Sequence, residues 1–139
     1  MKKKLIFSIA DAKYPVSASV QHEIMGRVCK DNGFDIGFYG AEDPELQHLN
    51  PWLNLKMRNL DKKYGGFCFF SLYQLMHDDD ILFKLRAVLR SNLVIAFAVE
   101  KMLFTSEESL LKNWLFLSSQ FQALRNRDFD FRHKKQHQV

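Results

Sequence analysis

Apolar runs of strand length alternate along this chain with longer stretches in which apolar residues recur at helical spacing. Residues 67–70 and 93–99 are apolar throughout, and residues 5–10 are apolar except for Ser8. Continuous runs of this length are typical of strands that are buried on both faces. The stretches between them, such as 79–91, repeat apolar residues every three or four positions, which indicates amphipathic helices.

This alternation predicts a three-layer α/β domain with a four- to five-stranded, mainly parallel sheet, because strand–helix–strand units form right-handed parallel crossovers. The expected strands cover residues 5–10, 35–39, 67–70 and 93–99, with a short fifth strand at 102–105. The expected helices cover residues 16–32, about 51–62, 79–91 and 106–126. In the first helix, Val20, Ile24 and Val28 are expected to form the buried stripe, and Asn32-Gly33 favours the C-terminal end.

The long C-terminal helix has a wider apolar stripe than the other helices. Five of its apolar residues step by four, three, four and three positions, as in a heptad seam: Leu110, Trp114, Leu117, Phe121 and Leu124. Leu111, Leu115 and Phe116 widen this stripe. Two interpretations are open. Either the whole helix packs on its own sheet, or one ridge covers the sheet and another forms a symmetric oligomer.

Composition and charge narrow the class of protein. The 139 residues fit a single domain over residues 1–126, followed by a basic tail over 127–139 that we expect to be disordered. Three of the four net positive charges lie in residues 125–139, so the body is nearly neutral, which argues against a specific nucleic-acid binder.

The first apolar run stops at Asp11, too soon for a signal peptide, and no run is long enough to span a bilayer. The two cysteines fall in predicted elements as small core residues, so we expect a cytoplasmic protein.

Polar residues follow the predicted parallel strands at the edge where α/β folds bind ligands. Glu100 comes directly after the apolar run 93–99 and is a candidate general acid or base, with His77 as its partner. Ser8, Ser71 and Gln74 are candidates for hydrogen bonding to ligand hydroxyls, and Tyr73 for stacking on a ring.

Each of the two acid–base candidates has a plain structural alternative. Glu100 can be a solvated acid at a strand end or pair with Lys101 or Lys13, and His77 can be a loop histidine before a helix that Asp78–Asp80 cap. The sequence lacks the glycine-rich dinucleotide motif, the phosphate-binding loop and the His-Glu-x-x-His motif. We therefore expect no cofactor and no metal.

Three passages resemble the catalytic domain of small serine recombinases (resolvases and invertases): residues 6–33, 66–75 and 91–100. In that family the first strand ends in Arg-x-Ser and the third strand leads into Leu-Asp-Arg-Leu. Here the matching positions read Ser8-Ile9-Ala10 and Leu72-Tyr73-Gln74-Leu75. The resemblance implies a resolvase-like fold that lacks the nucleophile and the phosphate-clamping arginines which strand exchange requires.

The chain also resembles the sporadic carbohydrate cluster proteins. The matching segments are Val20-Gln21-His22, residues 29–33, residues 70–75 and Phe97-Ala98-Val99-Glu100. This resemblance implies a role in surface-polysaccharide or unusual-sugar biosynthesis but does not identify a reaction.

Two hypotheses about the function follow. One is a protein that binds a sugar or sugar nucleotide at the sheet edge, with Glu100 and His77 as an acid–base pair. The other is a non-enzymatic homo-oligomeric scaffold, held together by the C-terminal helix, in the same pathway.

Overall fold

Five strands form one mixed sheet in the computed structural model, which describes residues 5–42, 63–75, 79–120 and 122–123. The strands are β1 (Leu5–Asp11), β2 (Asp35–Glu42), β3 (Tyr64–Phe69), β4 (Val94–Phe97) and β5 (Met102–Phe104). Their order in the sheet is β2-β1-β3-β4-β5. The first four strands are parallel and β5 is antiparallel to β4. The expectation of an α/β protein with a mainly parallel sheet is confirmed.

The described helices are α1 (Ala18–Asp31), the 3₁₀ helix η2 (Leu72–Leu75), α3 (Ile81–Arg90) and α4 (Glu107–Lys112). Asn32 caps the end of α1 and Gly33 follows with φ 83°, as the Asn-Gly pair predicts. Asp80 occupies the N-cap position of α3, although its side chain makes no capping hydrogen bond. The helix expected at about 51–62 lies outside the described residues.

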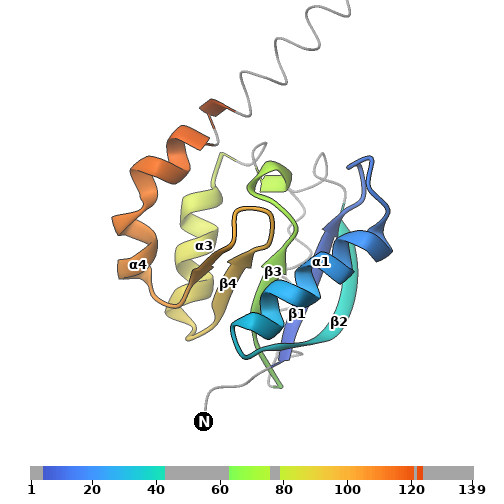
Figure 1. The fold of residues 1–139 in the computed structure, drawn as a ribbon. Coiled ribbons are helices and arrows are strands. Elements are labelled where there is room, and N and C mark those ends of the chain that lie inside the picture. The colour runs from blue at the N-terminus through green and yellow to red at the C-terminus, as the bar shows by residue number, and fades with distance from the viewer. Residues whose placement is uncertain (1–4, 43–62, 76–78, 121, 124–139) are drawn as a thin grey trace, which may run out of the picture.

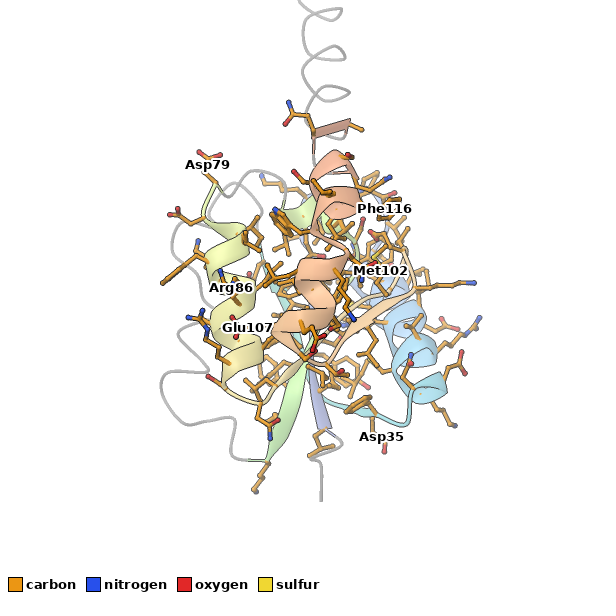
Figure 2. All side chains as sticks on the ribbon, turned by 90° about the vertical axis from the view of Figure 1, so that its left-hand side faces the viewer. Asp35, Asp79, Arg86, Met102, Glu107 and Phe116 are labelled. Carbon is orange, nitrogen blue, oxygen red and sulfur yellow. The ribbon has the colours of Figure 1, made fainter. Side chains whose placement is uncertain are left out.

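Helices cover both faces of the sheet, so the described elements form three layers. Figures 1 and 2 show α1 on one face, with α3 and α4 on the other. On the α1 face Ile6, Ala10 and Cys68 pack with Met25 and Cys29, and both cysteines are buried and free. The opposite face is lined with phenylalanines that belong to one core cluster with apolar residues of α3 and α4: Phe7, Phe67, Phe69 and Phe97. Together with Phe104, five of the thirteen phenylalanines of the chain belong to this cluster, whereas Phe34 and Phe70 pack on the α1 face.

The buried stripe of α1 differs from the predicted one by one position. Gln21, Met25 and Cys29 are the buried residues, whereas Val20 is 43% exposed. Ile24 and Val28 only pack against the edge of the core. A glutamine lies on the buried face, in the first turn of α1, because hydrogen bonds satisfy its amide, which a hydrophobicity pattern cannot anticipate.

The C-terminal helical region is not continuous over the described residues. Asn113 is the C-cap of α4, and residues 114–120 are helical again after this turn. Leu110 and Leu117 are fully buried and Trp114 packs against the same core, so the first part of the predicted seam faces the sheet. Its remaining members, Phe121 and Leu124, lie outside the described residues, as does the basic tail.

No helix in the described part of the chain combines the length and the apolar character that crossing a membrane needs.

Candidate functional site

Ser71 and Glu100 meet at the carboxyl edge of the sheet. The Ser71 hydroxyl donates a hydrogen bond of 2.8 Å to Glu100 Oε1, which also accepts one of 2.7 Å from the backbone N–H of Leu72. Both side chains are partly exposed. Two candidate residues that are 29 positions apart in the sequence are thus in direct contact.

The backbone of the β4–β5 connection places Glu100 there. After β4 ends at Phe97, the N–H groups of Ala98 and Val99 still bond to the carbonyls of Phe69 and Phe70. A turn then follows, closed by Lys101 N–H on the Ala98 carbonyl, and Lys101 has a φ of 55°. The connection therefore extends beside the end of β3 and turns at the point where Glu100 can reach η2.

The two oxygens of Glu100 are used unequally. Oε1 receives both short hydrogen bonds, whereas the contact from Leu72 N–H to Oε2 is 3.4 Å long. The carboxylate accepts an N–H that the start of a helical turn leaves without an intrahelical partner, so it acts as a cap supplied from a distant segment. Oε2 is the oxygen better placed to receive a further donor.

Gln74 joins the ends of two neighbouring strands. Its Oε1 accepts hydrogen bonds from the N–H groups of Phe70 and Ser71, at 2.9 and 3.3 Å, and its Nε2 donates to the Ile9 carbonyl at 3.2 Å. The residue is 1% exposed. In a sheet of this order the ligand crevice lies between β1 and β3, where the connections diverge to opposite faces. Gln74 spans that position, and its side-chain amide is engaged in hydrogen bonds that order this edge.

A second buried glutamine orders the neighbouring loop and was not among the predicted site residues. Gln21 accepts a hydrogen bond from Asp11 N–H at 2.7 Å and donates to the carbonyls of Asp11 and Val16, both at 2.9 Å. It therefore fixes the connection from β1 to α1. Gln21, Met25 and Cys29 recur every four positions, and this spacing is the sequence signal for the place of Gln21 on the buried face.

Ser8 lies apart from the edge, in the middle of β1 and under α1. Its side chain is fully buried, and its Oγ is 2.6 Å from His22 Nδ1 and 3.4 Å from Met25 Sδ. Imidazole nitrogen is a better acceptor than a thioether, so we assign the Ser8 hydroxyl as the donor to His22 Nδ1. The ring proton of His22 is then on Nε2. Ser8 therefore tethers α1 to the sheet through His22.

His22 is the histidine whose environment the structure describes. Burial lowers the pKa of His22 below its usual value of 6.5, and the nearby backbone carbonyl of Gly40 partly opposes this shift. The ring of Tyr39 packs edge-on against the imidazole, with the ring centres 5.1 Å apart. The imidazole is accordingly neutral at pH 7.

The remaining predicted residues are not placed. The backbone of Tyr73 belongs to η2, but its side chain is outside the description, and His77 and Asp78 lie outside the described residues. Among the residues that are described, no three His, Cys, Asp or Glu side chains come together as a metal site. The structure thus brings together Ser71, Glu100 and the amide of Gln74, and separates Ser8 from them.

Comparisons with protein-family models, with curated proteins and with solved structures find no match to this chain.

Proposed function

We propose that the Ser71–Glu100 pair is the polar centre of a site for a small hydroxylated ligand of the sugar type, in a protein of surface-polysaccharide or unusual-sugar biosynthesis. The contact between the two side chains at the sheet edge carries the proposal. A carboxylate and a hydroxyl, both partly exposed and both held in place, are suited to bind the hydroxyl groups of such a ligand. The biosynthetic pathway named in this proposal comes from the resemblance of the sequence to the sporadic carbohydrate cluster proteins.

The charge of the pair favours a neutral ligand. Glu100 is negative, and the segment in the position of the recombinase Asp-Arg pair carries no charge, as its sequence Ser71-Leu72-Tyr73-Gln74-Leu75 shows. A phosphate brought to this carboxylate would meet repulsion. We therefore expect a sugar ring to bind better than the phosphate groups of a sugar nucleotide, which would have to extend away from Glu100.

Proton transfer is the chemistry that this site offers if the protein is an enzyme. Oε2 of Glu100 receives only the longer contact from Leu72 N–H and would accept a proton from a ligand hydroxyl, while Oε1 stays fixed by Ser71 and Leu72. His77 stays a prediction for the second acid–base group.

A binding experiment with two Glu100 variants tests the site. Monosaccharides and sugar nucleotides are screened by ligand-observed NMR against the wild type, Glu100→Gln and Glu108→Gln, where Glu108 is an exposed glutamate of α4. Glu100→Gln keeps an acceptor for Leu72 N–H and removes the charge. We expect Glu100→Gln to weaken binding roughly tenfold or more, because a hydrogen bond to a charged group is lost. Glu108→Gln should leave binding unchanged.

A stability measurement separates the capping role of Glu100 from its role in binding. Glu100→Ala removes the acceptor of Leu72 N–H and is expected to lower the free energy of unfolding by about 1 kcal/mol, and Glu100→Gln by less. Absence of any binder in the screen, or equal binding by wild type and a folded Glu100→Gln, would exclude the site.

The second candidate function is the non-enzymatic scaffold. It is favoured by a separate observation, the exposure of Leu115 and Phe116 after α4, at 86% and 52%.

A further inference from the structure

Two partly exposed apolar side chains lie on either side of the end of β3, where Ser71 binds Glu100. Tyr14, in the connection from β1 to α1, is 39% exposed, and Val99, in the connection from β4 to β5, is 54% exposed. Figure 1 shows both connections at the end of the sheet where β3 leads into η2. Aromatic and apolar side chains beside a few fixed polar groups are typical of sites for small ligands.

Phe70 connects Tyr14 to the polar pair. The ring centres of Phe70 and Tyr14 are 5.4 Å apart, and the Phe70 carbonyl accepts a 2.9 Å hydrogen bond from Val99 N–H. The next residue in the chain is Ser71, whose hydroxyl donates to Glu100. Phe70 itself is 4% exposed. Tyr14 therefore packs on the buried residue that directly precedes the serine of the pair.

The connection that carries Tyr14 is fixed by backbone hydrogen bonds. Tyr14 N–H donates to the Asp11 carbonyl at 3.3 Å, and Lys13 N–H donates to Asp11 Oδ1 at 2.9 Å. Ala12 N–H donates to the carbonyl of Glu42 at 2.9 Å, which ties the connection to the end of β2. A tyrosine on a fixed backbone loses little conformational entropy when a ligand packs against it.

A pyranose matches this combination of an aromatic ring and a carboxylate. Its hydroxyl groups lie at the rim of the sugar ring, where a carboxylate and a serine can bind them. Its C–H groups gather on the faces, and positively polarised C–H groups pack well on the negative face of an aromatic ring. We propose that the sugar ring packs on Tyr14 while Glu100 and Ser71 bind its hydroxyl groups. This inference rests on the proposed function and narrows its ligand to a neutral pyranose with several C–H groups on one face.

Saturation-transfer difference NMR on the full chain tests the proposal. Methyl glycosides of glucose, galactose and mannose are the probes, with free uracil and adenine as planar ligands that lack a sugar. We expect the strongest saturation at the C–H groups of one pyranose face. Tyr14→Ala should weaken binding roughly three- to tenfold and abolish this preference, and Tyr14→Phe should restore both. Phe83→Ala is the matched control, because Phe83 is an exposed aromatic residue of α3 in the other layer.

Tyr14→Leu guards against a folding defect, because leucine keeps apolar contact with Phe70 but has no aromatic ring. It should bind as weakly as Tyr14→Ala while its thermal unfolding stays close to that of the wild type. A glycoside that depends on Glu100 but binds equally to wild type and both variants would overturn this inference and leave the proposed function in place. A wild type that binds no glycoside would overturn both. Binding of uracil or adenine alone, lost in Tyr14→Ala, would overturn the assignment of Tyr14 to a sugar.

Discussion

At the scale of single residues, Glu100 shows how one carboxylate combines local structure with candidate chemistry. It caps η2 through a short hydrogen bond to Oε1, whereas the contact to Oε2 is longer. A general base must be held in a fixed geometry, and the capping interaction provides this with both short hydrogen bonds on one oxygen. Substitutions that keep the cap, such as Glu100→Gln, are therefore the informative ones for function.

His22 gives the fold a dependence on pH whose sign follows from its environment. Burial lowers its pKa in the folded chain below the usual 6.5, whereas the unfolded chain takes up the proton near 6.5. Between these two pH values the unfolded state binds more protons, so the free energy of unfolding falls as the pH decreases. We expect His22 to make its full contribution to the free energy of unfolding above pH 6.5. That contribution should decrease as the pH falls from 6.5 toward the pKa of His22 in the folded chain.

Urea unfolding between pH 7.5 and 5 on the wild type and His22→Gln measures this effect. Glutamine can accept the Ser8 hydrogen bond but does not titrate. The free energy of unfolding should therefore depend less steeply on pH in the variant than in the wild type. The chain has five histidines, which makes the difference between the two proteins the relevant quantity. Identical slopes would show that His22 is not buried in the way described.

At the scale of elements, the contact between β3 and β4 requires a glycine. A Cβ atom at Gly66 would collide with the backbone carbonyl of Val94, which cannot move without breaking the parallel pairing of the two strands. We expect Gly66→Ala to lower the free energy of unfolding by about 1–3 kcal/mol, the usual cost of overpacking. Chemical denaturation measures the change.

Gly26→Ala is the matched control for this prediction. A Cβ at Gly26 would meet only Ile36 Cδ1, at 3.6 Å, and the residue lies inside α1, where alanine is favoured over glycine. The same substitution should therefore stabilise the protein, by up to about 1 kcal/mol. If both variants were destabilised equally, steric contact between β3 and β4 would not be the cause.

The elements also show where prediction from the sequence succeeds and where it stops. The apolar runs at 67–70 and 93–99 predict β3 and β4 because burial on both faces leaves no polar position. Ala98 and Val99 continue the run although they belong to the turn, because they stay buried or bonded beside β3. Similarly, the apolar spacing continues through Asn113, where the helix breaks, because periodicity does not register a change in backbone path.

At the scale of the whole molecule, the alternation of strands and helices predicts the parallel sheet but not which polar residues meet. Residues at the ends of parallel strands share one edge, which is why Ser71 and Glu100 were both candidates. Ser8 was expected at that edge as well, yet it faces α1 in the middle of β1. The partners of Gln21, Gln74 and His22 depend on the register and packing of segments distant in sequence, which no local pattern encodes.

The hydrogen bond from Gln74 to Ile9 joins residues 65 positions apart. A contact of that span forms only after the chain has closed a long loop, so its entropic cost is met late in folding. The edge that carries Ser71 and Glu100 should then be assembled after β3 and β4 have paired, and should be among the first parts to open. Hydrogen exchange would therefore be faster at the N–H groups of Phe70 and Ser71 than in the strands behind them. A ligand that binds at this edge would act on folding kinetics chiefly by slowing unfolding.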